Sequence, residues 1–326
     1  MTCTVSRRHA LARLACLAAP LPLAARAAAY PDKPVTFVVP FPAGGSTDAL
    51  MRAIQPRLAE KLGQPVVIEN QAGVGGALGA AKVANAAADG YTVLAGSTNE
   101  MVYAPTLNPN VRYKPQDFAP VGLMIGTPVL LVARADLPAS SADELVGLLR
   151  ARPEGLSFGS PGVGTLQHML MEDLQARAKV RMVHVPYKGA GPLLNDVLGG
   201  QLDLAVMVPS SALPHLKSGR LKLIGVASLQ RDPLLPSFPT LNEGKLVSGL
   251  ESNGWIGLFV PKKAPAAAVA RLHDAMAATL ADPAVQKRVA DLGMRVASAA
   301  EQRAFPETFS RDEAKVRSIA ARVKLD

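Results

Sequence analysis

The chain has 326 residues, of which 49% are hydrophobic and 19% charged, and its net charge is +9. A chain of this size and composition buries a large core and divides into about two domains. Its basic residues are scattered and only 4% of its residues are aromatic, so it lacks the basic stripe with stacking platforms that nucleic-acid-binding proteins present. We therefore expect no nucleic-acid partner.

Residues 1–27 have the three parts of an export signal, namely arginines, an apolar stretch from Leu14 to Ala25, and small residues that suit cleavage after Ala27 or Ala29. The paired arginines fit both the general secretory and the twin-arginine route. Without this leader, which carries four arginines and no acidic residue, the net charge falls to +5. No later stretch has the roughly 18 apolar residues of a membrane span, so we expect a soluble periplasmic protein.

The remaining chain lacks the motifs of common catalysts. Cys3 and Cys16 both lie in the leader, which leaves neither a disulfide nor a thiolate nucleophile. The histidines are not spaced as metal ligands, and Leu78 stands where a dinucleotide fingerprint needs glycine. Phe158 stands where the elbow of a serine hydrolase would need glycine before Ser160. We predict no metal, no cofactor and no enzymatic activity.

Short β-branched runs alternate with segments of helical period, which predicts βα units and an α/β fold with largely parallel sheets. Helices fill the intervals between strands, and Ser141 with Glu144 and Ser298 with Glu301 fit capping boxes. The predicted strands are 34–39, 65–69, 91–95, 128–133, 156–159, 181–185, 202–208, 221–227 and 255–260.

Two segments indicate how the domains connect. Residues 227–254 are rich in proline and weakly periodic, which predicts a connection rather than a helix or strand. The chain after Pro265 is nearly all helical, and helices without strands must cover a sheet formed elsewhere. We expect the C-terminal part to return to the first domain.

Four glycine-rich turns each follow a predicted strand and precede a predicted helix, at 40–48, 70–80, 158–170 and 185–192. Glycine allows close approach of a ligand, and the first amides of a helix have no partner. A carboxylate supplies acceptors and is favoured by the helix dipole, so such turns bind anions without a basic side chain. Because the carboxyl ends of parallel strands share one edge of a sheet, we predict one anion-binding cleft. Alternatively, each turn only caps its helix, with Ser46 or Thr47 as an N-cap.

Further side chains near these turns are weaker candidates. His168 would line or support the site, Lys188 would pair with an anionic ligand, and Asp203 would select a ligand amine. Each has a structural alternative. His168 would instead stabilise the loop, Lys188 would be a solvated surface residue, and Asp203 would shape the entry of a strand. Asp48 fits the first turn of a helix for dipole reasons alone, and Trp255 is predicted to fill the joint between lobes.

These segments, in this order and spacing from Tyr30 to the C-terminus, resemble the periplasmic solute-binding receptors of tripartite tricarboxylate transporters, the Bug receptors of beta-proteobacteria. The blocks that carry the resemblance are "YPDKPVTFVVPFPAGGSTD", "IENQAGVGGALGA", "DGYTVL", "SPGVGTLQHM", "VPYKGAGPLLNDVLGGQLDL" and "GLFVPKKAP".

The resemblance implies a type II periplasmic binding protein, with two doubly wound α/β lobes, two crossovers and a ligand cleft between the lobes. Residues 28–127 and 253–326 would form lobe 1, and residues 128–252 lobe 2. A small organic carboxylate is the implied ligand, integral membrane permease subunits are the implied partners, and we expect a monomer. Two alternatives stay open: a ligand-sensing protein that signals to a membrane sensor, and an enzyme that uses the same cleft.

In this family, turns of both lobes hold the carboxylate through backbone amides, hydroxyls and waters. These groups recognise the carboxylate alone, so dicarboxylates, tricarboxylates, amino acids and aromatic acids all stay open as ligands. By motif, the resemblance nominates Ala43, Gly44, Gly45, Ser46, Thr47, Ser160, Gly162, Gly164 and Thr165. Second-rank candidates are Gly73, Ser97, Thr98 and Asn99.

Overall fold

The computed structural model describes residues 30–233 and 235–321. The predicted leader, its cysteines and its cleavage bond lie outside these residues. The strands are β1 (Val35–Val39), β2 (Val66–Asn70), β3 (Thr92–Ser97), β4 (Phe118–Pro128), β5 (Leu130–Arg134), β6 (Ser157–Ser160), β7 (Val183–Pro186), β8 (Leu204–Met207), β9 (Leu221–Val226), β10 (Asn253–Pro261) and β11 (Arg295–Val296).

Helices and helical turns connect these strands. They are α2 (Ser46–Leu62), η2 (Val74–Gly76), α3 (Ala77–Ala84), η3 (Asn99–Tyr103), α4 (Ala104–Leu107), η4 (Pro115–Asp117), α5 (Ala142–Ala151), α6 (Leu166–Ala178), α7 (Ala190–Leu198), α8 (Pro209–Lys217), α9 (Ala266–Leu280), α10 (Pro283–Asp291), α11 (Ala299–Arg303) and α12 (Phe305–Ala320).

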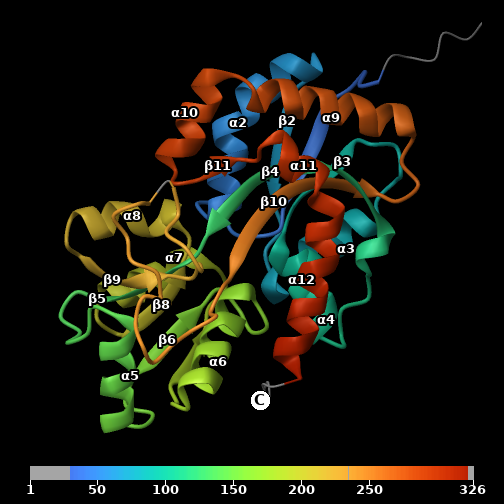
Figure 1. Cartoon of the computed structure of the whole chain (residues 1–326). Helices are drawn as coiled ribbons and strands as arrows, with labels where there is room; N and C mark the ends of the chain where they lie inside the picture. Colours follow the sequence, from blue (N-terminus) through green and yellow to red (C-terminus); the bar gives the residue numbers. More distant parts are fainter. Residues whose placement is uncertain (1–29, 234, 322–326) are drawn as a thin grey trace, which may run out of the picture.

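The strands form two separate sheets (Figure 1). The six-stranded sheet has the order β11-β4-β10-β3-β1-β2, and the five-stranded sheet has the order β7-β6-β8-β5-β9. Strands β1, β2 and β3 run parallel, as do β6, β7 and β8, whereas β10 is antiparallel to β3 and β4, and β5 is antiparallel to β8 and β9. The α/β prediction is confirmed, with mixed rather than largely parallel sheets.

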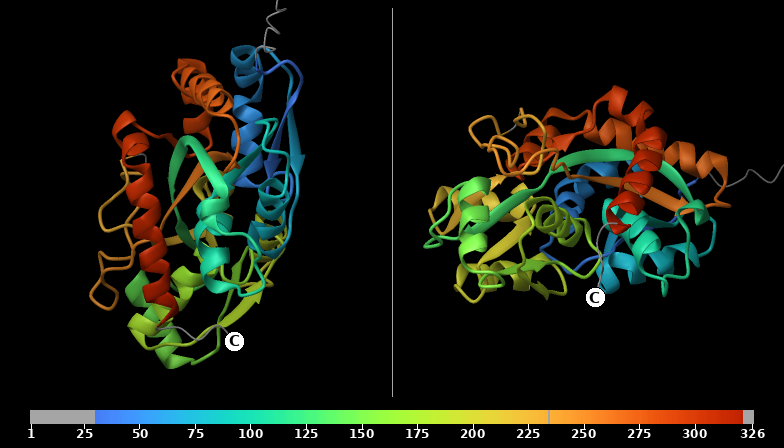
Figure 2. Two further views of the ribbon diagram at one scale, coloured as in Figure 1. Left: turned by 90° about the vertical axis from the view of Figure 1, so that its right-hand side faces the viewer. Right: turned by 60° about the horizontal axis from the view of Figure 1, so that its bottom comes forward.

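Helices cover both faces of the six-stranded sheet (Figures 1 and 2). Helices α9 and α10 pack against α2, and α12 packs against η3 and α4. The prediction that the C-terminal helices cover a sheet formed by earlier residues is therefore confirmed. Successive residues of β1 serve different cores, since Phe37 and Val39 pack with α2 and α9, while Val38 joins a cluster that also contains Leu131 and Phe158 of the five-stranded sheet.

The chain crosses between the sheets twice. It first crosses at Val129, between β4 and β5, and it returns through residues 227–252, which contain no helix or strand among the described residues. Asn242 holds this return segment together, because its side chain donates to the carbonyls of Ser228 and Leu250 and accepts from the Leu250 amide. The predicted lobe boundaries stay a prediction, and we use lobe 1 and lobe 2 for the parts that they define.

Strand β4 was missed by the sequence prediction, which placed a strand only over 128–133. Proline and glycine interrupt β4, and its register with β10 shifts at two points. Gly122 is required by packing, since a Cβ there would lie 2.4 Å from the Cε of Met276 on α9. The glycine that weakens the strand signal is thus the residue that lets α9 approach the sheet.

Of the two predicted capping boxes, the one at Ser298 and Glu301 is complete. At the start of α5, the Glu144 amide donates to the Ser141 hydroxyl, but the Glu144 carboxylate accepts from the amide of Ser140 instead of that of Ser141. The second box is therefore only half formed as predicted.

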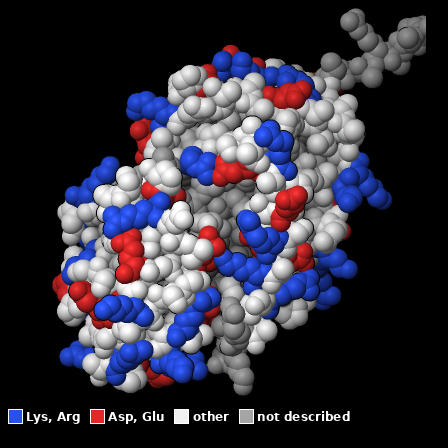
Figure 3. All heavy atoms as spheres, in the orientation of Figure 1, with Lys and Arg blue, Asp and Glu red and all other residues white. Residues whose placement is uncertain are grey.

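Charged side chains of both signs are interspersed over the face drawn in Figure 3. Lysine and arginine alternate there with aspartate and glutamate on both lobes, in keeping with the scattered charge of the sequence. Over the residues that the structure describes, no helix is both long enough and apolar enough to cross a membrane.

We expect Gly159→Ala to destabilise the protein, because a Cβ at this position of β6 would lie 2.2 Å from the Cδ1 of Leu193 and 2.5 Å from the Cδ2 of Leu202. The expected loss in the free energy of unfolding is about 1–3 kcal/mol. The matched control is Gly147→Ala in α5, where a Cβ has no neighbour within 4 Å. This variant should raise the free energy of unfolding by about 0.5–1 kcal/mol. Urea unfolding measures both, and equal effects of the two variants would contradict the packing.

Candidate functional site

A pocket of about 120 Å³ lies between the two lobes, and we call it the inner pocket. Of the described residues that line it, none is charged. Lobe 1 contributes Phe41, Pro42, Ala43, Gly45, Ser46, Thr47, Ser97, Thr98, Asn99, Thr127, Gly254, Trp255 and Ile256. Lobe 2 contributes Val129, Pro161, Leu166, Gln167, Ala190, Gly191, Pro192, Leu193, Val206, Met207 and Val208.

Helix α2 starts at the wall of the inner pocket. Its N-cap is Gly45, which is extended (φ −71°, ψ 169°), and the helix begins at Ser46 without a side-chain cap. The alternative in which Ser46 or Thr47 caps the helix is therefore wrong, because Gly45 is the N-cap and both residues already lie inside the helix. The first amides of α2 lack intrahelical partners, and no intramolecular partner of the Ser46 or Thr47 hydroxyl occurs within residues 30–233 and 235–321.

Asp48 holds the turn before α2 in place. One carboxylate oxygen accepts from the Gly44 amide and from Arg52 Nε, both at 2.9 Å, and the other accepts from Asn70 Nδ2 at 3.0 Å. Burial opposes ionisation of Asp48, but the hydrogen bonds from Arg52, Gly44 and Asn70 outweigh it and hold the pKa of the carboxyl below its usual range. Asp48 therefore braces the turn, beyond the dipole effect expected from sequence.

Two helices of lobe 2 also begin at the inner pocket. Helix α7 starts after Gly189, whose φ is 116°. A Cβ at Gly189 would lie 3.0 Å from the Cδ of Pro42, so glycine lets this turn approach lobe 1. The first turn of α6 contributes Leu166 and Gln167.

Asn99 of lobe 1 bridges to the start of α6. Its Oδ1 accepts a hydrogen bond from the Leu166 amide at 2.8 Å, and its Nδ2 donates to the Gln167 Oε1 at 3.4 Å. Both bonds cross between the lobes, so the structure shows the lobes in contact around the pocket. The side chain of Asn99 therefore already has hydrogen-bond partners in the opposite lobe.

A second, outer pocket of about 500 Å³ adjoins the inner one and shares Phe41, Pro42 and Pro161 with it. The turn at 73–76 of lobe 1 meets the turn at 161–165 of lobe 2 there. A Cβ built on Gly162 would lie 3.6 Å from the Cα of Gly75, so the two glycine turns are in near contact.

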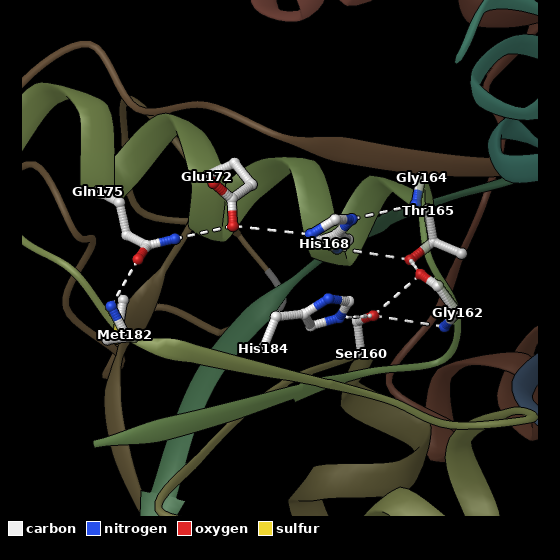
Figure 4. Close-up of polar contacts among 9 residues, drawn as sticks. All are labelled: Ser160, Gly162, Gly164, Thr165, His168, Glu172, Gln175, Met182 and His184. Atoms are coloured by element: carbon white, nitrogen blue, oxygen red, sulfur yellow. Dashed lines mark hydrogen bonds and ion pairs between the residues drawn. The ribbon is translucent and has the colours of Figure 1, made fainter. Parts of the chain in front are cut away.

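Buried hydroxyls brace the lobe 2 turn from below (Figure 4). Ser160 Oγ donates to the Gly162 carbonyl at 2.9 Å, and Thr165 Oγ1 donates to the same carbonyl at 2.8 Å. Thr165 also caps α6 by accepting from the His168 amide. Ser160 and Thr165 are almost fully buried, so their hydroxyls support the turn rather than face the inner pocket.

Two stacked histidines lie beneath the same turn (Figure 4). The ring centroids of His168 and His184 are 3.8 Å apart, and His168 Nδ1 accepts from the Gly164 amide at 3.0 Å. Ser160 Oγ lies 2.7 Å from His184 Nε2. Burial and the neighbouring His168 lower the pKa of His184 to about 4, so this ring is neutral near pH 7.

The structure distributes the residues predicted from sequence over three places. Ala43, Gly45, Ser46, Thr47, Ser97, Thr98 and Asn99 line the inner pocket. Gly73, Gly162, Gly164, Thr165 and Lys188 line the outer pocket. Gly44, Ser160, His168 and Asp203 line neither pocket.

Asp203 lies away from the cleft. Its carboxylate pairs with Arg134 Nε at 2.9 Å and accepts from the Ser157 amide at 2.8 Å. Ser157 begins β6, whereas the glycine-rich turn follows the other end of that strand at Ser160. The role of selecting a ligand amine is therefore wrong for Asp203, and shaping a strand entry is the better description.

Several lining residues were missed by sequence reasoning. The stretch Ala190–Leu193 overlaps the end of the turn at 185–192, from which only Lys188 was selected, and Gln167 and Thr127 carried no signal of their own. The glycine at 189 before a proline-containing helix start was the available sign.

Trp255 is the only tryptophan of the chain and forms part of the inner pocket wall. Its indole Nε1 donates to Asp312 Oδ2 of α12 at 2.9 Å, and its backbone amide donates to Thr98 Oγ1 at 3.0 Å. It lies near the start of β10, where the chain re-enters the six-stranded sheet, and these bonds fix it there.

Among the described residues, no group of three or more histidine, cysteine, aspartate or glutamate side chains is placed to hold a metal ion.

Sequence comparison finds relatives over most of the chain. The model of the tripartite tricarboxylate transporter family receptor matches residues 50–321. The UPF0065 protein in the tcbD-tcbE intergenic region of a Pseudomonas species is 37% identical over 300 residues, covering 91% of this chain and 89% of that protein. Protein BugT of Bordetella pertussis is 36% identical over 235 residues, covering 72% of each chain.

Solved structures agree in fold over about nine tenths of the chain. The periplasmic binding protein BugD matches with a TM-score of 0.84 and 33% identity, covering 91% of this chain and 99% of that one. MatC from Rhodopseudomonas palustris with bound malate matches at 0.83 and 33% identity, with coverage of 89% and 99%. A second R. palustris protein, with adipate, matches at 0.84 and 30% identity, with coverage of 90% and 98%. The chain therefore belongs to the tripartite tricarboxylate transporter receptor family, as one of its Bug proteins.

Proposed function

We propose that the protein is a periplasmic receptor that captures a small organic dicarboxylate in the inner pocket and delivers it to a tripartite tricarboxylate-type membrane permease. The observation that carries this proposal is an uncharged pocket onto which α2 of lobe 1 and α7 of lobe 2 both direct their first turns. The relatives solved with malate and with adipate support the ligand class.

The geometry suits a ligand that is negative at both ends. A carboxylate at the start of α2 would accept from the free amides and hydroxyls near Ser46 and Thr47, and the helix dipole would favour its charge. A second carboxylate would meet the start of α7 near Ala190 in the same way. Val129 and Ile256 line the pocket as well, and their apolar surfaces suit the carbon chain between the two ends.

Capture would proceed by closure of the lobes over the ligand. A ligand favours the closed form only through contacts that the open form lacks. The hydrogen bond from the Leu166 amide to Asn99 crosses the lobes, as would a ligand that bridges α2 and α7. Gly75 and Gly162 allow the turns at 73–76 and 161–165 to approach closely, since a Cβ built on Gly162 would lie 3.6 Å from the Cα of Gly75.

Receptor function is favoured over catalysis. Of the described residues that line the inner pocket, none is a histidine, cysteine, lysine, aspartate or glutamate, so the pocket offers none of the usual general bases. The predicted leader at 1–27 would export the protein to the periplasm, where such a receptor meets its ligand.

The first test is a screen of the purified protein against small acids. We expect malate and adipate to raise the melting temperature, and diols or diamines of matching chain length to have no effect. Aspartate should bind more weakly than malate, because the pocket has no carboxylate to pair with an ammonium group that loses its water. The proposal would be contradicted if the diamines or diols raised the melting temperature, or if none of the carboxylates did.

The backbone amide at the start of α2 can be tested separately from the hydroxyl. Ser46→Pro removes both, yet proline is tolerated at the first position of a helix, and the extended Gly45 suits a following proline. Ser46→Ala is the matched control, because it keeps the amide. We expect the proline variant to weaken dicarboxylate binding by about tenfold or more relative to the alanine variant, as measured by calorimetry. Equal affinities of the two variants would show that this amide does not bind the ligand.

The bridge at Asn99 should contribute to closure. Asn99→Ala removes the acceptor of the Leu166 amide, which we expect to weaken ligand binding by about 1 kcal/mol and to shift the ligand-free protein toward an open form. Small-angle X-ray scattering would then give a larger radius of gyration without ligand than for the unmodified protein. Unchanged scattering and unchanged affinity would together rule out this role.

A further inference from the structure

Glu100 is a buried carboxyl directly behind the wall of the inner pocket. It lies in η3, has no exposed surface, and follows Asn99 in the chain. One of its oxygens accepts from the Ser97 amide, and Oε2 lies 2.7 Å from Ser97 Oγ. A Cβ built on Gly76 would lie 2.9 Å from Oε2, so the turn at 73–76 covers the carboxyl from the other side.

The carboxyl has no cationic partner. Over the described ranges of the chain, no lysine, arginine or histidine forms an ion pair with Glu100. Two helices that pack against η3 carry charged side chains, and the partners of two of these lie elsewhere. Lys82 of α3 pairs with Glu69, and Asp312 of α12 accepts a hydrogen bond from Trp255.

Tyr113 is the titratable group that contacts Glu100 most directly. Its hydroxyl donates to the Glu100 backbone carbonyl, and burial together with the Glu100 charge raises the pKa of Tyr113 well above its usual range, so Tyr113 stays neutral. Burial likewise raises the pKa of Glu100 to about 7, although the hydrogen bonds from Ser97 oppose the shift. Both protonation states of Glu100 are therefore accessible near neutral pH.

Ser97 connects this carboxyl to the ligand site, because Ser97 lines the inner pocket. A serine hydroxyl has one proton to donate. When Glu100 is ionised, the Ser97 hydroxyl donates to it and can offer only lone pairs to the pocket. When Glu100 is protonated, its own O–H can donate to Ser97 Oγ, and the Ser97 proton is then free to turn toward a ligand carboxylate.

We propose that Glu100 and Ser97 link ligand capture to proton uptake, so that the receptor binds its carboxylate ligand more tightly when Glu100 is neutral. The neutral form gives the pocket one more donor and removes a buried negative charge from behind its wall. Binding to the ionised form takes one proton from solvent, which stays on Glu100. This inference rests on the proposed function of the inner pocket.

The linkage sets the direction of the pH dependence. A ligand carboxylate raises the pKa of Glu100 further, because like charges disfavour ionisation. Affinity is then highest below the pKa of about 7 in the free protein, and it falls as pH rises through that value. The fall reaches about tenfold for each unit by which the ligand raises the pKa.

The experiment is calorimetry with malate or adipate, whichever the purified protein binds, between about pH 6.5 and about pH 8.5, where the ligand carboxylates are ionised. We expect affinity to fall over this range. We also expect the binding enthalpy near pH 7.5 to depend on the ionisation enthalpy of the buffer, with the sign of proton uptake. Affinity that does not change with pH, together with a buffer-independent enthalpy, would overturn the linkage while leaving carboxylate binding intact.

Two variants assign the effect to these side chains. Glu100→Gln keeps an acceptor for the Ser97 amide and a donor for its hydroxyl, so we expect an affinity that is independent of pH and shows no proton uptake. Ser97→Ala should lower the affinity at about pH 6.5 more than at about pH 8.5. The histidines are unchanged in both variants, so a pH dependence that persists in Glu100→Gln would assign the proton to another group and overturn the proposal. If Glu100→Gln fails to fold, the buffer series on the unmodified protein and the Ser97→Ala profile still decide the question.

Discussion

The proposed binding site depends on unpaired backbone amides at the starts of helices that arise from different sheets. In each lobe the helix follows a strand at its carboxyl end, so the turns of β1 and β7 bring α2 and α7 to the same pocket. No charged side chain among the described lining residues competes for the ligand or compensates for a misplaced turn. The proposed recognition of a negative group would therefore depend on how accurately the backbone is held.

The buried polar side chains around the pocket serve this purpose. Asp48 uses both carboxylate oxygens to hold the turn before α2, and Ser160 and Thr165 converge on the Gly162 carbonyl in lobe 2. The histidine stack supports that second turn without adding a charge near pH 7 at His184. Residues of this kind would influence the proposed ligand through the backbone that they position, although they do not line the inner pocket.

Sequence reasoning recovered the features that local chemistry determines. The glycine-rich turns, the capping box at Ser298 and the irregular return segment at 227–252 could all be read from residue types at fixed spacing. Strand β4 could not, because its prolines and glycines suppress the strand signal, and the glycine at 122 is explained only by its contact with α9, which is distant in sequence. The ligand-amine role of Asp203 failed for a similar reason, since its partner Arg134 is brought to it only by the pairing of β5 with β8, whereas the alternative of shaping a strand entry fits the structure.

The predicted site residues divide according to how their side chains are used. The hydroxyls at the start of α2, those of Ser46 and Thr47, have no intramolecular partner among the described residues, and both residues line the inner pocket. Those nominated with them by motif, such as Ser160, are fully hydrogen-bonded inside the turn. The motif places the glycine-rich turns, but only three-dimensional hydrogen bonding separates the groups that are open to the pocket from those that hold the turn.

The position of Trp255 has a practical consequence. It is the single indole of the chain, it forms part of the pocket wall, and its Nε1 is tied to the Asp312 carboxylate. A charge or a displaced water beside this ring alters the polarity around it, and this polarity determines the wavelength of tryptophan fluorescence emission. Binding of the proposed ligand would therefore change the emission of Trp255, with no other tryptophan in the sequence to obscure the signal and no label required.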